Sequence, residues 1–143
     1  MTRLAYLSTD PGIALGATKG AAVHLHEVVG ALANEGAEVL VLVHGRVPDA
    51  EPPPGVTVEL LPGPGKGALL AERLAAEPVR ARWIEERLSS FEPSALLERI
   101  ALHSAAGAAA AHALGVPHLV ELNAPLPGEA AAYRRLELPG AAE

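Results

Sequence analysis

The sequence predicts an α/β fold, with a Rossmann-like parallel sheet and helices on both of its faces. Three observations predict it. Short apolar runs alternate along the chain with longer segments of helical periodicity. Most of the runs are continuous and rich in branched residues, as strands buried on both faces are. Glycine, proline or polar residues follow the runs and favour turns. We expect one domain over residues 1–143, incomplete at its C-terminal end.

The first half of the chain carries the clearest elements. Residues 3–7 and 38–43 are apolar enough to be central strands, and residues 20–34 have a helical period. Gly36 is placed to end that helix in a left-handed cap. Residues 44–55 are rich in proline and acidic residues, which predicts a surface loop. Residues 56–61 alternate between apolar and polar side chains, which predicts an edge or half-exposed strand.

In the second half, Pro78 divides a helical segment. Residues 68–76 and 79–90 are expected as two helices or as one kinked helix, because proline disrupts a helix interior. Residues 94–98 and 118–122 are expected as strands. Residues 102–114 form an alanine-rich helix that Gly115 ends. Residues 123–127 form a loop, and a last helix is expected at 128–136.

Composition excludes several functional classes. The chain has 143 residues, a formal net charge of −6 at pH 7 and no cysteine. An acidic balance argues against general binding to nucleic acid or to anionic membranes. Without cysteine there is no disulfide framework and no thiolate chemistry. The apolar runs are too short for a signal peptide or a transmembrane segment, so a cytoplasmic location is expected.

The stretch after the first strand is typical of a turn that receives a phosphate. Glycines recur at positions 12, 16 and 20, Lys19 precedes the last of them, and a helix follows. Glycine lets the backbone come close to a ligand, and a helix N-terminus offers unpaired N–H groups and partial positive charge. The competing interpretation is that these glycines only permit a tight turn between strand and helix.

The turn does not match two well-known glycine motifs. A P-loop requires Gly-Lys followed by Ser or Thr, and here Lys19 precedes Gly20. A dinucleotide fold requires Gly-x-Gly-x-x-Gly and an acidic residue after the second strand. Arg46 near that position would suit a 2′-phosphate, but the glycine spacing argues against a dinucleotide. No cofactor is expected.

Two longer segments carry a family resemblance: AYLSTDPGIALGATKGAAVHLHEVVGALANEGAEVLVL and, further on, LLERIALHSAAGAAAAHALGVPHLVELNAPL. The chain resembles the N-terminal domain of the family-four retaining glycosyltransferases, which have the two-domain GT-B architecture. The resemblance implies transfer of a sugar from a nucleotide-sugar donor to a sugar or another hydroxyl acceptor. It also implies a second, donor-binding domain that this chain lacks, so we expect no activity from the chain alone.

The sequence is also compatible with other functions. The chain could be a stand-alone module that binds a nucleotide or a phosphosugar, or a non-functional truncated product. An oxidoreductase fragment that uses NADP through Arg46 is a further alternative. Whether the chain is a fragment or a short natural protein does not follow from its residues.

The candidate binding residues lie in three turns that should open at the carboxyl edge of the sheet. Gly16, Lys19 and Gly20 would form a phosphate cradle. His24 belongs to the VHLHE run of the resembling segment and is equally well interpreted as a surface or packing residue. His24 and His26 should point to different faces of the helix, so they cannot share a metal, and no metal site is expected.

The other candidates follow the last two strands. Glu98 and Arg99 resemble a Glu-Arg motif of the glycosyltransferase family, and Arg can hold a phosphate through two hydrogen bonds. A solvated ion pair is the competing interpretation. Glu121 and Asn123 occupy the loop where the resemblance implies a histidine. An amide can bind a sugar hydroxyl but cannot transfer a proton, and the Asn-Ala-Pro run is also typical of a simple turn.

Overall fold

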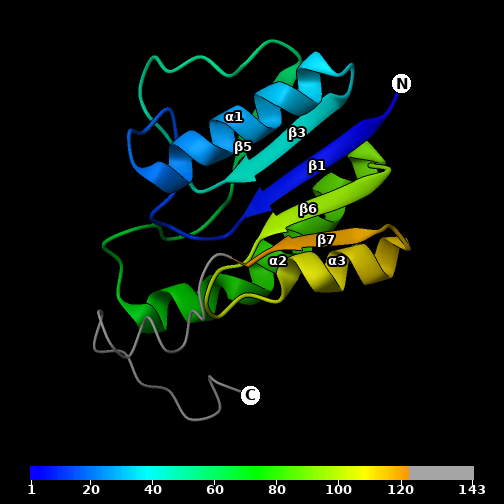
Figure 1. Ribbon diagram of the computed structural model, residues 1–143. Helices are drawn as coiled ribbons and strands as arrows, with labels where there is room; N and C mark the ends of the chain where they lie inside the picture. The colour runs from blue at the N-terminus through cyan, green and yellow to red at the C-terminus, as the bar shows by residue number, and fades with distance from the viewer. Residues whose placement is uncertain (123–143) are drawn as a thin grey trace.

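The computed structural model describes residues 1–122, and these form a parallel five-stranded sheet with helices on both faces (Figure 1). The strands lie in the spatial order β5-β3-β1-β6-β7. Their bounds are β1 (Arg3–Ser8), β3 (Glu38–Val43), β5 (Val56–Leu60), β6 (Ala95–Arg99) and β7 (His118–Glu121). The fold class predicted from the sequence is confirmed, and β5 is an edge strand as the alternation of residues 56–61 predicted.

Each face of the sheet has its own apolar core. Helix α1 (Gly20–Asn34) packs Leu25 and Val29 against alternate residues of β1 and β3, among them Tyr6 and Val41. On the opposite face, α2 (Leu70–Phe91) and α3 (Ala106–Leu114) bury a second apolar cluster. Successive strand residues point to opposite faces, so continuous apolar runs are needed to fill both cores.

Pro78 does not divide the second helical segment: α2 is one helix with this proline inside it. Of the two arrangements expected there, two separate helices or one kinked helix, the first is therefore wrong. Pro78 lies on the exposed side of α2, while Ile84 and Leu88 on the other side are fully buried. The carbonyl group that loses its partner, that of Leu74, belongs to a residue that is itself exposed. Burial of the inner face stabilises the helix despite the missing hydrogen bond.

Two further elements differ from the expected bounds. Helix α3 begins at Ala106 rather than near residue 102, because His103 has a φ of 66°, which helical backbone does not allow. The expected loop at 44–55 contains the short strand β4 (Gly45–Arg46), which pairs in parallel with β2 (Ala14–Leu15). The expected loop at 123–127 and helix at 128–136 lie outside the described residues. None of the helices within residues 1–122 has the length and hydropathy that a membrane span requires.

The order of the strands reverses beside β1. The chain moves from β1 outward to β3 and β5, then returns across the sheet to β6 on the other side of β1. In open α/β sheets, ligands bind at the carboxyl ends of the strands beside such a reversal. Here the residues at that position are Ser8 and Arg99, which are register partners at the ends of β1 and β6.

Candidate functional site

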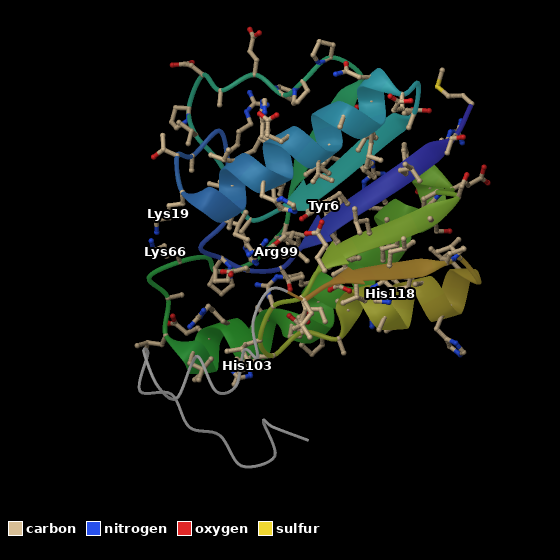
Figure 2. All side chains as sticks on the ribbon, viewed as in Figure 1. Tyr6, Lys19, Lys66, Arg99, His103 and His118 are labelled. Carbon is tan, nitrogen blue, oxygen red and sulfur yellow. The ribbon has the colours of Figure 1, made fainter. Side chains whose placement is uncertain are left out.

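The two lysines of this chain, Lys19 and Lys66, lie side by side at the carboxyl edge of the sheet (Figure 2). Lys19 comes from the turn between β1 and α1, and Lys66 from the loop between β5 and α2. The contact with Lys66 lowers the pKa of Lys19, and the nearby Asp10 carboxylate opposes this effect. Two ammonium groups in contact repel each other, whereas an anion between them would be attracted by both.

The N-terminus of α1 adds partial positive charge beside Lys19. Lys19 is the N-cap residue, its side chain makes no capping hydrogen bond, and the first turn has no acidic residue. The Lys19 carbonyl accepts hydrogen bonds from the amides of Ala22 and Val23. The amides of Gly20 and Ala21 are not used by any hydrogen bond within the described residues. Free amides at a helix N-terminus beside a lysine favour anion binding.

A network of polar side chains from three elements joins Glu121 to the face of the sheet under α1. The Tyr6 hydroxyl donates a 3.0 Å hydrogen bond to Glu121 Oε2, and His24 Nε2 lies 3.2 Å from Glu121 Oε1. Tyr6 is fully buried, so burial and the Glu121 carboxylate raise its pKa well above the ordinary value. The structure thus brings together His24 and Glu121, two residues that the sequence nominated separately.

The Glu98-Arg99 pair is divided between the two faces of the sheet. Arg99 is the register partner of Glu121 in β7 and lies on the face under α1. Glu98 points to the opposite face, where Glu98 Oε2 lies 2.7 Å from His118 Nε2, and it is only 4% exposed. Burial raises the pKa of Glu98, and the contact with His118 opposes that effect. Consecutive strand residues cannot act on one ligand from one face.

The remaining candidate residues are Gly16, Gly20 and Asn123. Gly16 has a φ of 84°, and a Cβ there would lie 2.4 Å from Ala50 Cβ, so this glycine permits the packing of the turn against the 44–55 loop. Gly20 is the first residue of α1, with open space around it. Asn123 lies outside the described residues.

Sequence reasoning missed Lys66, Tyr6 and His118. A usable signal existed for Lys66: it follows a predicted strand, and the chain contains just one other lysine. In the sequence, Tyr6 and His118 lie within the expected strands 3–7 and 118–122, where nothing marks them as part of a site. Their partners, Glu121 and Glu98, are 115 and 20 positions away in the sequence. Nothing in the local pattern indicates such pairs.

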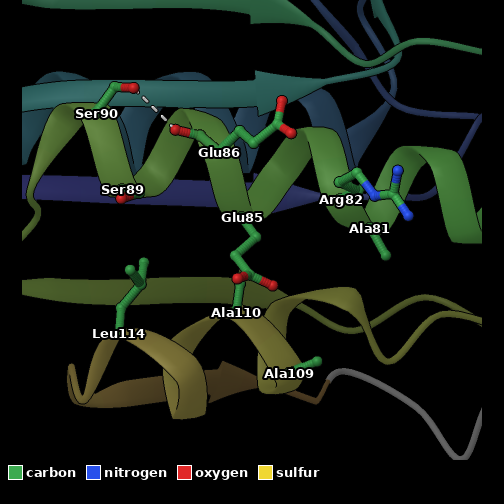
Figure 3. A pocket seen from close by; sticks show the side chains of 9 residues that line it. All are labelled: Ala81, Arg82, Glu85, Glu86, Ser89, Ser90, Ala109, Ala110 and Leu114. Carbon is green, nitrogen blue, oxygen red and sulfur yellow. Dashed lines mark hydrogen bonds between the residues drawn. The ribbon is translucent and has the colours of Figure 1, made fainter.

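The described part of the chain offers no cluster of three metal-ligating side chains. It does contain a hollow of about 620 Å³ between α2 and α3, with Arg82 and Glu85 on one wall and Ala109 and Ala110 on the other (Figure 3). Of the two serines in its lining, Ser90 donates its hydroxyl hydrogen bond to the Glu86 carbonyl within α2. The polar groups of this hollow do not converge, so we place the candidate site at the carboxyl edge of the sheet.

The comparisons with known proteins show the fold. No protein-family model and no curated protein matches this sequence. Among solved structures, sucrose-phosphate synthase from Thermosynechococcus elongatus matches with a TM-score of 0.65 and 12% identity over 99% of this chain. MurG from Acinetobacter baumannii matches with a TM-score of 0.52 and 15% identity over 84% of this chain. Both have the fold of GT-B glycosyltransferases. The chain spans 38% and 34% of their lengths.

A third similar structure has a different name. It is the C-terminal domain of a hydrogenase from Pyrococcus furiosus, with a TM-score of 0.59 and 16% identity. The match covers 84% of this chain and 91% of that domain. At these identities the likeness shows a shared Rossmann-like fold, and function has to be argued from the site.

Proposed function

We propose that this chain is the acceptor-side half of a glycosyltransferase that uses a nucleotide-sugar donor. The observation that supports the proposal most directly is the meeting of Lys19 and Lys66 beside the open N-terminus of α1. The similarity of the fold to two longer glycosyltransferase structures agrees with it. In such an enzyme the second half of the cleft would come from a donor-binding domain.

The chemistry of sugar transfer suits this arrangement. Negative charge grows on the departing diphosphate as the sugar leaves, and preorganised positive groups stabilise that charge. Lys19, Lys66 and the free amides of α1 would supply the positive groups. An anion between the two lysines would remove the repulsion that lowers the pKa of Lys19, so both ammonium groups would be charged in the complex.

The network around Glu121 would hold the acceptor. Carboxylates bind sugar hydroxyls well, and the hydrogen bond from Tyr6 and the contact with His24 fix the orientation of the Glu121 carboxylate. The His24 side chain is 47% exposed, so its ring is accessible to a ligand at the carboxyl edge of the sheet. Arg99, the register partner of Glu121, lies beside the strand-order reversal, where it could bind a phosphate or hydroxyl group.

The first experiment is a calorimetric titration of residues 1–143 with uridine, adenosine and guanosine diphosphates. We expect saturable binding that weakens at least about tenfold in Lys19→Ala and Lys66→Ala, because each variant loses one hydrogen bond between a charged group and the ligand. Arg82→Ala is the matched control, because it removes one exposed positive charge from the far side of α2. Equal affinity in Lys19→Ala and Arg82→Ala contradicts the proposal.

A second candidate function is a stand-alone module that binds a phosphorylated ligand. The hydrogenase domain supports it, because there the same fold occurs as a unit of nearly the same extent. Both functions require the lysine pair. They differ in a second measurement: sugar transfer should appear when a donor-binding domain is supplied to a transferase half, and should never appear for a binding module.

A further inference from the structure

A second set of polar side chains lines a small cavity beside the start of α2, and neither lysine belongs to it. The cavity has a volume of about 30 Å³ and lies among the ends of β1 and β3, the loop before α2 and the loop before α3. Its polar lining includes Thr9, His44, Arg73, Glu77, Arg80 and His103. A space of this size holds about one water molecule or one oxygen atom of a larger group.

Three of the lining residues carry buried polar atoms without a partner among the described residues. These atoms are Thr9 Oγ1, Arg73 Nε and His103 Nε2. Thr9 is only 5% exposed. Buried polar groups in native proteins are nearly always hydrogen-bonded, so these three groups are placed to bind a polar group that enters the cavity. The fourth such atom in the described chain is Ser8 Oγ, next to Thr9.

The charges around the cavity favour an anion. Arg80 is already paired with Glu77 at 2.9 Å and donates to the carbonyls of Pro62 and Pro64. Arg73 has no carboxylate within 4.0 Å among residues 1–122. Burial and the neighbouring Arg80 lower the pKa of His44 to about 4, so this ring is neutral at pH 7. The lining thus contains two guanidinium groups and one carboxylate, that of Glu77, which is already paired with Arg80.

We propose that this cavity is a binding subsite for a small oxyanion, a phosphate or carboxylate group, held by Arg73, Thr9 and His103. Guanidinium and hydroxyl groups donate hydrogen bonds to such oxygens, and so does an imidazole N–H. The volume admits one oxygen of the group. Leu74 lines the cavity and is 40% exposed, so the cavity lies just beneath the surface and the rest of the group would extend outward there.

The subsite goes beyond the proposed transferase function and stands independently of it. Arg73 and His103 belong to α2 and to the loop before α3, which carry neither lysine of the proposed diphosphate site. Thr9 comes from the same β1–α1 turn as Lys19, so the two sites are neighbours with different charged groups. A ligand with two anionic groups could occupy both sites. A single small anion would distinguish between them.

The test uses the full chain, residues 1–143, at constant ionic strength set with chloride. Binding of inorganic phosphate and, separately, of acetate is followed by two-dimensional amide NMR. The variants are Arg73→Gln, Thr9→Val and His103→Asn, the last because asparagine tolerates the left-handed backbone of position 103. The controls are Arg82→Gln, which removes an exposed charge elsewhere on α2, and Lys19→Ala.

We expect saturable binding of at least one anion, with shifts at the amides around Thr9 and His103, and affinity reduced at least tenfold in each of the three variants. Arg82→Gln and Lys19→Ala should leave that affinity within about twofold of the original. Binding of both anions assigns a general oxyanion site, and binding of phosphate alone assigns a phosphate site. No saturable binding of either anion overturns the proposal and leaves a cavity for water.

The two proposals fail in different ways. Loss of phosphate binding in Lys19→Ala, with Arg73→Gln unaffected, assigns the anion to the lysine pair and overturns this subsite alone. If neither lysine variant weakens nucleotide diphosphate binding, the transferase proposal is overturned. The result for inorganic phosphate at the subsite is unaffected by that outcome. If one variant does not fold by circular dichroism, the other two still decide the outcome.

Discussion

The Tyr6 hydroxyl and the Glu121 carboxylate form a 3.0 Å hydrogen bond across three strands of the sheet, from β1 past β6 to β7. It ties strand β7 to the centre of the fold and holds Glu121 next to its register partner Arg99, at the carboxyl end of β6. Tyr6 is fully buried, so its hydroxyl has no access to water and depends on Glu121 as its hydrogen-bond partner.

We expect Tyr6→Phe to lower the free energy of unfolding by about 1 kcal/mol, the usual net value of one hydrogen bond. Glu121→Ala should cost about 1 to 3 kcal/mol, because it leaves the buried Tyr6 hydroxyl without an acceptor. Urea denaturation of both single variants and of the double variant measures the coupling. Additive effects in the double variant would show that the two side chains do not interact.

Gly107→Ala should destabilise the protein although alanine is the better helix former. A Cβ at position 107 would lie 2.0 Å from Glu98 Oε2, and that carboxylate is buried against α3. We expect a loss of about 1 to 3 kcal/mol, typical of overpacking in a core. Gly65→Ala is the matched control, because no heavy atom lies within 4 Å of a Cβ there. Combining Gly107→Ala with Glu98→Ala should recover part of the loss.

Gly16→Ala and Gly36→Ala separate backbone strain from steric overlap. Both glycines have positive φ, 84° and 91°, so alanine at either position carries the cost of the left-handed region, about 1 kcal/mol. At Gly16 the new Cβ would also lie 2.4 Å from Ala50, whereas the space around Gly36 is open. Thermal unfolding should therefore show a clearly larger drop in Tm for Gly16→Ala. Equal drops in Tm would show that Ala50 does not obstruct a Cβ at position 16.

His44 should make the protein less stable in mild acid. Its pKa in the folded protein is about 4, below the ordinary value of 6.5, because burial and Arg80 disfavour the charged ring. Between these two values the unfolded chain binds a proton that the folded chain does not. Its contribution to stability is thus present above pH 6.5 and lost as the pH falls toward 4, on the order of 2 kcal/mol after allowing for partial solvent exposure.

Urea denaturation at pH 7 and pH 4.5 measures this effect. His44→Gln should flatten the pH dependence, because glutamine does not titrate. His112→Gln, at an exposed position of α3, is the control and should keep the original slope. The same slope in both variants would show that His44 does not control the acid sensitivity.

Much of the fold followed from local patterns. The continuous apolar runs at β1 and β3 predicted buried strands, and the alternation of residues 56–61 predicted the edge position of β5. At Pro78 the sequence left two helices or one kinked helix open. The structure has one helix, because burial of the inner face of α2 outweighs a residue that disrupts isolated helices. The tertiary packing outweighed the local preference there.

The candidate site was predictable only where local chemistry carries it. Lys19, before a glycine and at the start of a helix, could be nominated from its neighbours in sequence. Its partner Lys66 comes from a loop 47 positions later, and no periodicity links the two. The Glu98-Arg99 pair illustrates the opposite case: neighbours in sequence point to different faces of the sheet, one to His118 and the other to the side of Glu121.

The sequence by itself determined the class of fold and the order of its main strands and helices along the chain, because hydrophobic period and turn residues act over a few positions. The tertiary structure decided which charges meet: Lys19 with Lys66, His24 with Glu121, and the unsatisfied groups of Thr9, Arg73 and His103 around one cavity. The physical reason is that electrostatic contacts depend on distance in space, which the order of the strands fixes and which no short stretch of sequence contains.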